Sequence, residues 1–330
     1  MSKNSNNNVL VVAGGGGFIG GHLVAALRGQ GRRVRAVDIK PLNEWYQKFH
    51  DVENVVADLK LLENARAACS DASVVYQLAA DMGGMGFIEH NKALCMLSVL
   101  TNTHMIEAAR EANVARFFYA SSACVYAADK QTDPNVTALK EEDAYPAMPE
   151  DGYGWEKLFS ERMCRHFRED FGLETRIARY HNVYGPHGTW AGGREKAPAA
   201  LCRKVIQAIH SGQHEIEIWG DGLQTRSFMY IDDCIKGTLA VTNSNILDPI
   251  NVGSSELVTI NQLADIAESI GGVKLKRRYN LDAPKGVNGR NSDNSQILKE
   301  LHWEPSIRLR DGMERTYRWI ESDFKRTLNE

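Results

Sequence analysis

The sequence predicts an α/β fold in which helices cover both faces of a parallel sheet, with a smaller α/β lobe toward the C-terminus. Three observations lead to this prediction. Short apolar segments alternate with amphipathic ones in the first half, and a glycine-rich turn follows the first apolar segment. Beyond Val183 the elements become shorter and glycines and prolines cluster between them. Strands separated by helical segments are typical of βαβ units and of a doubly wound parallel sheet.

The elements of the first half follow from apolar runs and glycines. Phe18 to Leu27 has helical spacing, and Gly29 and Gly31 end that helix. A longer amphipathic stretch runs from about residue 87 to residue 113. The strand candidates are short and rich in apolar or β-branched residues, and they cover residues 9–12, 33–38, 54–59, 74–79 and 116–121.

The second half of the sequence has shorter predicted elements and more glycine- and proline-rich segments than the first half. Glycines and prolines cluster between Gly185 and Pro198, and again from Asp282 to Gly289, with shorter elements between them. Such clusters mark loops and turns rather than long regular elements. They predict a smaller lobe assembled from late segments of the chain.

Composition and charge exclude several classes of protein. Hydrophobic residues make up 43% of the 330 residues and charged residues 25%, which excludes a disordered tail, a collagen-like fibre and a membrane bundle. The net charge of −3, from 39 basic and 42 acidic residues, is unlike a nucleic-acid footprint or a polybasic membrane anchor. We therefore expect neither nucleic acid nor a membrane as a partner.

The cysteines indicate a reducing compartment. All six are scattered, with no C-x-x-C pair and no cysteine–histidine spacing that would hold zinc. The polar residues 1–8 lack the apolar core of a signal peptide, and no run approaches the roughly 18 apolar residues of a membrane span. The sequence predicts a cytoplasmic protein with reduced thiols and no metal site.

The glycine turn indicates a dinucleotide site. Gly14, Gly17 and Gly20 fit G-x-x-G-x-x-G between the first strand and the first helix. Such a turn lets the backbone approach a pyrophosphate, whose charge faces the amides of the helix N-terminus. Asp38 ends the second strand, where a carboxylate binds the adenosine ribose hydroxyls and repels a 2′-phosphate. The pattern predicts a Rossmann-type domain that binds NAD in preference to NADP.

Two details of this site stay open. Arg35 and Lys40 lie near Asp38 in the sequence and leave room for NADP. Asp58, at the end of the third strand, either meets the adenine amine or is a solvated carboxylate. The residues that we predict to bind the cofactor are Gly14, Gly17, Phe18, Ile19, Gly20, Asp38, Asp58, Ala79, Tyr153 and Lys157.

Tyr153 and Lys157 are spaced so that both lie on one face of a helix. A nearby ammonium lowers the pKa of a phenol from about 10 toward the working pH. Such a pair can take a proton from a sugar hydroxyl while its hydride leaves to nicotinamide. A serine-rich segment, SSACVY at 121–126, ends the fifth predicted strand.

The glycine turn, this strand end and the Tyr–Lys pair together resemble the extended short-chain dehydrogenase/reductase family. That family includes the nucleotide-sugar epimerases and dehydratases. The resemblance covers the chain from Val9 to about Trp303. It implies that Ser122 works with Tyr153 and Lys157 in catalysis.

The residues after Ser122 distinguish chemistries within that family. Its 4,6-dehydratases carry an Asp-Glu pair there, and this chain has Ala123-Cys124, which argues against dehydration. A cysteine can serve as a proton-transfer group. It can equally be a small buried hydrophobe, as most free cysteines are. The chemistry of Cys124 by itself leaves both interpretations open.

Three loop segments narrow the resemblance. Residues 80–87 (ADMGGMGF), 192–200 (GGREKAPAA) and 220–228 (GDGLQTRSF) closely resemble the branch of the family that epimerises GDP-mannose. The resemblance implies that Cys124 and Lys196 are the acid/base pair and that Tyr153 and Lys157 are the redox pair. The residues that it implies for the nucleotide-sugar are Gly83, Ser122, Ala123, Cys124, Asn182, Glu195, Lys196, Lys204, Gln224, Thr225, Arg226 and Arg290.

The resemblance also implies a reaction. Oxidation at carbon 4 acidifies the hydrogens on carbons 3 and 5, Cys124 as base and Lys196 as acid invert those carbons, and reduction gives GDP-L-galactose, with GDP-L-gulose as partial product. It further implies a homodimer. The predicted division is an NAD-binding domain of residues 1–180 plus roughly 225–255, and a nucleotide-sugar lobe of 181–224 plus 256–330. The alternatives are a 4-epimerase, in which Cys124 and Lys196 are idle, and a non-catalytic NAD-binding protein.

Overall fold

The computed structural model describes residues 9–284 and 286–328. The polar segment 1–8, which is not predicted to be a signal peptide, lies outside the described residues. Its largest sheet is parallel throughout and runs in the order β11-β6-β5-β4-β1-β2-β3. Its strands are β1 (Val9–Ala13), β2 (Arg33–Asp38), β3 (Glu53–Val56), β4 (Ala72–Gln77), β5 (Arg116–Ser122), β6 (Thr175–Tyr180) and β11 (Ile250–Val252).

The order of these strands reverses between β1 and β4. From β1 the chain builds outward through β2 and β3, and it then returns to add β4, β5 and β6 on the other side. At such a switch point the loops at the carboxyl ends of the strands diverge and leave a crevice for ligands. The predicted doubly wound α/β class is confirmed.

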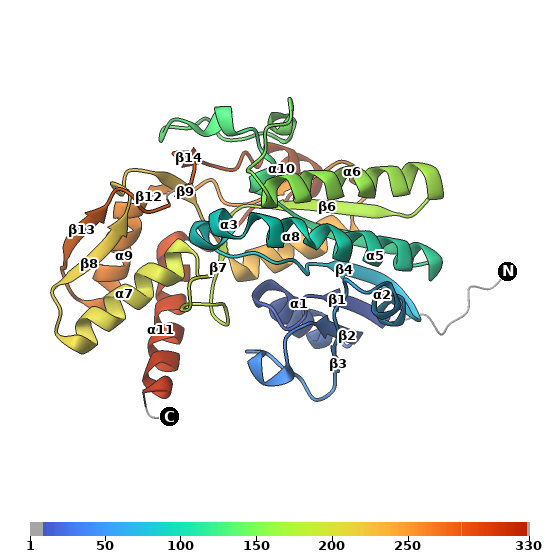
Figure 1. The fold of residues 1–330 in the computed structure, drawn as a ribbon, viewed down its shortest axis with the longest axis horizontal. Coiled ribbons are helices and arrows are strands. Elements are labelled where there is room, and N and C mark those ends of the chain that lie inside the picture. Colours follow the sequence, from blue (N-terminus) through green and yellow to red (C-terminus); the bar gives the residue numbers. More distant parts are fainter. Residues whose placement is uncertain (1–8, 285, 329–330) are drawn as a thin grey trace.

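Helices cover both faces of the sheet (Figure 1). On β1, Leu10 and Val12 belong to one apolar cluster, whereas Val9 and Val11 belong to another, because successive side chains of a strand point to opposite faces. The first cluster includes residues of α1 (Phe18–Gly29) and α8 (Ile231–Asn243). The second includes residues of α2 (Leu62–Cys69), α5 (Ser98–Glu111) and α6 (Tyr153–Phe171).

The late segments form a smaller α/β lobe beside the sheet, seen at the left of Figure 1. Two of its strands pair in parallel, β8 (Glu215–Trp219) and β13 (Lys276–Asn280), and α7 (Ala197–Ser211) packs on β8. The other elements after β6, apart from α8 and β11, are β7 (Val183–Tyr184), β9 (Thr225–Ser227), β10 (Met229–Tyr230), β12 (Leu257–Thr259), α9 (Ile260–Gly271), β14 (Gly289–Arg290), α10 (Ser295–Leu301) and α11 (Leu309–Thr327). The domain boundaries given above stay predictions.

Two sequence-based predictions differ from the structure. The stretch from residue 87 to 113 is not one helix but three, namely α3 (Met85–His90), α4 (Lys92–Met96) and α5. Asn91 interrupts it with φ −132°, and its side-chain amide donates to the Phe87 carbonyl at 2.8 Å, competing with the helical backbone. The third strand ends at Val56, because the Asp58 carboxylate accepts from the Lys60 amide at 2.9 Å and starts a turn.

Short 3₁₀ helices complete the chain: η1 (Leu42–Glu44), η2 (Ala123–Val125), η3 (Ala128–Gln131) and η4 (Glu141–Ala144). None of the helices in the described ranges is long and apolar enough to cross a membrane. Among the same residues, no group of three or more histidine, cysteine or acidic side chains is placed to hold a metal ion.

Candidate active site

The glycine turn between β1 and α1 has the tight packing that a pyrophosphate site requires. Gly14 has φ +82°, and the Gly17 amide donates to its carbonyl oxygen at 3.0 Å. A Cβ on Gly20 would collide with that same oxygen. The amino end of α1 therefore lies directly against the turn, and the first amides of a helix are a favourable site for phosphate.

A cavity of about 720 Å³ opens at the switch point between β1 and β4, within the usual size range of ligand pockets. Every residue predicted to bind the cofactor lines it, from Gly14 in the turn to Lys157 on α6. Ser122 and Lys196 line it as well. The glycine turn, the strand ends and the start of α6 thus share one cavity.

Asp38 lies at one end of this cavity with its carboxylate partly engaged. One oxygen accepts from the Gly16 amide at 3.1 Å and the other from the Lys40 amide at 3.0 Å. A carboxylate has about four acceptor positions, so about two remain for ribose hydroxyls. Arg35 pairs with Glu53 at 2.8 Å and is therefore not held ready for a 2′-phosphate.

The structure brings Ser122, Tyr153 and Lys157 together. Ser122 ends β5, and α6 begins at Tyr153 after Gly152, whose φ is +83°. Tyr153 and Lys157 are both buried, with the Lys157 ammonium 5.4 Å from the centre of the Tyr153 ring. A hydrogen bond to the Ser122 side chain favours the phenolate form of Tyr153.

The sequence predicts a Tyr153 pKa shifted down toward the working pH, but the side chains of the protein by themselves shift it in the opposite direction. Burial raises the pKa of Tyr153 well above its usual value, and the nearby Cys124 and Glu156 raise it further. The Lys157 ammonium instead donates to the Ala120 carbonyl at 3.1 Å. Additional positive charge in the cavity is therefore needed to make the phenolate accessible.

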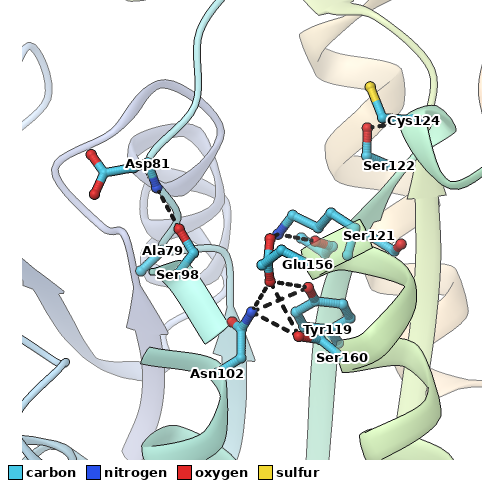
Figure 2. A network of polar contacts seen from close by, with 12 residues as sticks. Ala79, Asp81, Ser98, Asn102, Tyr119, Ser121, Ser122, Cys124, Glu156 and Ser160 are labelled. Carbon is cyan, nitrogen blue, oxygen red and sulfur yellow. Dashed lines mark hydrogen bonds and ion pairs between the residues drawn. The ribbon is translucent and has the colours of Figure 1, made fainter. Parts of the chain in front are cut away.

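Glu156, the residue before Lys157, belongs to a buried polar network that the sequence did not predict (Figure 2). Glu156 is 3.9 Å from the Lys157 ammonium and accepts from the hydroxyls of Tyr119 and Ser160, each at 3.2 Å. Asn102 of α5 also donates to Glu156. The network thus fixes the position of Glu156, the acidic partner of Lys157. In the sequence, nothing marks Glu156 except its position next to Lys157.

Cys124 follows Ser122 at the end of β5, and its sulfur points away from the Glu156 network in Figure 2. An Arg290 guanidinium nitrogen lies 3.4 Å from that sulfur. Burial and the Glu150 carboxylate raise the pKa of Cys124 to about 11. Burial lowers the pKa of Lys196, which lies near enough to Cys124 for the two groups to interact electrostatically.

The remaining predicted sugar-site residues lie around Cys124 or in the adjoining loops. Arg226 on β9 is paired in register with Arg290 on β14, and both are buried. The Gly84 amide donates to the Arg194 carbonyl at 3.0 Å, so the loops that contain Gly83 and Lys196 are in contact.

Six others are engaged in contacts of their own. Asn182 donates to the Ser227 carbonyl, Gln224 to the Trp219 carbonyl, Thr225 to the Pro134 carbonyl and Lys204 to the Glu217 carbonyl, while Glu195 pairs with Arg203 and Ala123 is buried in η2. None of these six lines the cavity described above. The structure therefore groups the cofactor residues closely and the sugar residues only in part.

Comparison with known proteins agrees with this arrangement. The profile of the NAD dependent epimerase/dehydratase family matches residues 10–253. The chain belongs to this family. GDP-mannose 3,5-epimerase 1 from Oryza sativa subsp. indica is 45% identical over 310 residues, which are 94% of this chain and 80% of the relative. GDP-mannose 3,5-epimerase from Arabidopsis thaliana is also 45% identical, over 94% of this chain and 81% of the relative.

Solved structures share the fold of this family member. UDP-glucose 4-epimerase from Thermotoga maritima, solved with UDP-glucose, has a TM-score of 0.85 at 23% identity and covers 97% of this chain and 99% of its own. MoeE5, in complex with UDP-glucose and NAD, has a TM-score of 0.78 at 27% identity, covering 96% of this chain and 99% of its own.

The residues of the cavity fit the NAD on which the family depends. The glycine turn leaves no room for side chains near a pyrophosphate, and Asp38 presents acceptors where ribose hydroxyls would lie. Lys157 and Tyr153 stand at the other end of the same cavity. NAD is the cofactor of this enzyme.

Replacing the Asp38 carboxylate tests its assigned role. We expect Asp38→Asn to weaken NAD binding about tenfold to a hundredfold, since hydrogen bonds to a charged group contribute about 1.5–3 kcal/mol. The preference for NAD over NADP should shrink as well, because the repulsion of a 2′-phosphate is removed. Dissociation constants from isothermal titration calorimetry measure both effects.

Asp71→Asn serves as the matched control, since this exposed aspartate lies in a turn with φ +57°, which asparagine adopts readily. Unchanged NAD affinity in Asp38→Asn would remove Asp38 from the cofactor site.

Proposed function

We propose that this enzyme epimerises GDP-D-mannose at carbons 3 and 5 to GDP-L-galactose, with GDP-L-gulose as the partial product. One observation carries the proposal: a buried cysteine stands beside Ser122 and Tyr153 in a chain that is 45% identical over 94% of its length to plant GDP-mannose 3,5-epimerases. An enzyme that inverts only carbon 4 has no use for a proton-transfer group at Cys124.

The chemistry begins at carbon 4, because an unactivated ring hydrogen is too weakly acidic for a cysteine or lysine to remove. Bound NAD supplies the oxidising equivalent and a positively charged ring. Tyr153 takes the hydroxyl proton, and Ser122 holds the phenolate by a hydrogen bond. Lys157, fixed by Ala120 and Glu156, adds the local positive charge.

The ketone at carbon 4 then makes the hydrogens on carbons 3 and 5 acidic. Cys124 and Lys196 are the pair that we assign to proton removal and return. The structure favours a thiol at Cys124, whose pKa is about 11, and shifts Lys196 toward the uncharged amine by lowering its pKa. Cys124 can therefore act as the base only if another group takes up its own proton first.

A second copy of the chain is the partner that we propose. Helices α4, α5 and α6 contact one another. Five large apolar side chains are exposed on these three helices and at Leu97, which lies between α4 and α5. Figure 1 shows α5 and α6 side by side on one face of the sheet. We call this set the α5–α6 patch: Met96, Leu97, Leu100, Trp155 and Phe159. Exposed apolar side chains grouped in this way mark an interface.

The compartment that we propose is the cytoplasm. All six cysteines are free and buried, and none is paired in a disulfide. Disulfides are rare in cytosolic proteins, where thiols are kept reduced. Free thiols throughout a chain of this length suit that environment.

Proton NMR in deuterium oxide tests the reaction directly. Incubation with GDP-mannose should place deuterium at carbons 3 and 5 and give products of galactose and gulose configuration. Inversion at carbon 4 without solvent deuterium would instead identify a 4-epimerase. No change in the sugar would contradict an activity on GDP-mannose.

Two variants serve as internal controls for this experiment. Cys124→Ser should lose deuterium incorporation and still bind GDP-mannose, whereas Tyr153→Phe should block oxidation at carbon 4 and so lose every product. Full deuterium incorporation in Cys124→Ser would remove this residue from the proton transfer.

Phe159→Glu tests the dimer. Phe159 is 55% exposed within the α5–α6 patch, and a buried carboxylate at the interface should convert a dimer to a monomer at micromolar concentration. Light scattering after size-exclusion chromatography measures the mass. Leu281→Glu is the control, because Leu281 is 70% exposed on the other lobe. A wild-type protein of monomer mass would refute the interface.

A further inference from the structure

Glu150 is a buried carboxylate that lies beside the proposed proton-transfer site. Its backbone amide donates to the Cys124 carbonyl at 3.0 Å, which holds the two residues side by side. Its side chain is 15% exposed, and neither carboxylate oxygen has a hydrogen-bond partner of ordinary geometry. A buried carboxylate without such a partner is costly to maintain, so it requires an explanation.

Arg290 connects Glu150 with the thiol. One guanidinium nitrogen of Arg290 lies 3.4 Å from the Cys124 sulfur, and the other lies 4.0 Å from a Glu150 oxygen. The guanidinium is held in place by Gln131, which accepts from its Nε at 2.6 Å. A single positive charge therefore contacts both groups that can carry a negative charge.

The thiol proton is the donor that this carboxylate can use. The Glu150 carboxylate lies near enough to Cys124 to raise the pKa of the thiol, and its oxygens have no other donor among the described residues. The remaining charged or titratable groups that interact with this pair are Lys92, Cys95, Tyr153, Lys196 and Arg226.

We propose that Glu150 and Cys124 share one proton, and that Glu150 is the positioning residue that takes up the thiol proton and returns it. In the forward step the S–H bond of Cys124 breaks and an O–H bond forms on Glu150, giving a thiolate and a carboxylic acid. In the reverse step the same proton returns to sulfur. During this transfer the pair carries one negative charge, and Arg290 balances it on either atom.

This inference rests on the proposed function and explains how the same residues can act twice. Each inversion adds a proton to the base and removes one from the acid, so the pair ends with its protonation states exchanged. If the second carbon requires the original states, protons must be redistributed before the second inversion. After the first inversion Cys124 and Glu150 are both protonated and Lys196 is an uncharged amine. Glu150 can then pass its proton to Lys196, which interacts electrostatically with both groups, and this transfer restores the starting state of all three.

The titration of Cys124 tests, without any substrate, whether the Glu150 carboxylate is coupled to the thiol, as proton sharing requires. The ¹³Cβ shift of labelled cysteine reports thiol ionisation, and Cys124→Ser assigns the signal. We expect Glu150→Gln to raise the thiolate fraction of Cys124 at pH 9.5 about tenfold, because a like charge next to the thiol is removed. Glu142→Gln changes an exposed glutamate of the preceding segment and should leave the titration as it is. Equal thiolate fractions in Glu150→Gln and the wild type would overturn the proposal.

Deuterium incorporation provides the functional readout. In Glu150→Gln, incorporation at pH 7 should fall about tenfold although the equilibrium thiolate fraction is higher, because no carboxylate remains to take up the thiol proton during turnover. It should recover as the pH rises and hydroxide takes up that proton. Glu150→Asp, which keeps the carboxylate, should restore part of the rate. A Glu150→Gln enzyme with the wild-type rate and pH profile would also overturn the proposal. If the wild type incorporates no deuterium, the proposed function fails, and the thiol titration still shows whether Glu150 and Cys124 are coupled.

Discussion

The first turn of helix α6 lies directly against the carboxyl end of strand β5, and the other parts of the site are placed by this contact. A Cβ on Gly154 would collide with the Cys124 carbonyl oxygen, so only glycine permits the approach. The contact sets Tyr153 beside Ser122 and leaves Lys157 one turn deeper. Because β5 is parallel to β4 and β4 to β1, the same edge of the sheet also carries the glycine turn.

Buried charges hold α6 in this position. Glu161 pairs with Arg179 of β6 at 2.7 Å and also accepts from Ser121 of β5, so one carboxylate joins the helix to two strands. One turn earlier, Glu156 bonds to Asn102 of α5. Removing one partner of a buried ion pair typically costs about 3–5 kcal/mol. The helix that carries the Tyr–Lys pair is therefore fixed on both sides, which favours a preorganised site over a mobile one.

The sequence was most informative where the signal is periodic. Strand β2 matches its predicted residues 33–38, and every predicted cofactor residue lines the cavity, because the glycine turn and the strand ends are local patterns with a fixed geometry. Asn91 was missed as a break in the long helical stretch, since its effect depends on one side-chain bond to Phe87.

The electrostatics of the site could not be predicted in the same way. The ammonium of Lys157 was expected to lower the pKa of Tyr153, and burial outweighs it. Burial depends on packing across the whole chain, which periodicity does not report. The contact between Cys124 and Arg290 joins residues 166 positions apart, and that between Asn102 and Glu156 joins residues 54 apart. Neither pair has a spacing that a sequence pattern could reveal.

These long-range contacts also explain why the site requires both parts of the fold. The edge of the sheet supplies Ser122, Tyr153 and Lys157, to which we assign the oxidation and reduction of the sugar hydroxyl with NAD. The late strands β9 and β14 supply Arg226 and Arg290 as adjacent buried cations, and the lobe loop before α7 supplies Lys196. Without these late segments, the Cys124 sulfur would lose the guanidinium of Arg290 beside it, and the acid/base pair that we propose for the flanking carbons would lose Lys196. We therefore assign the step from oxidising one carbon to inverting two others to side chains that the late segments add to the redox residues at the sheet edge.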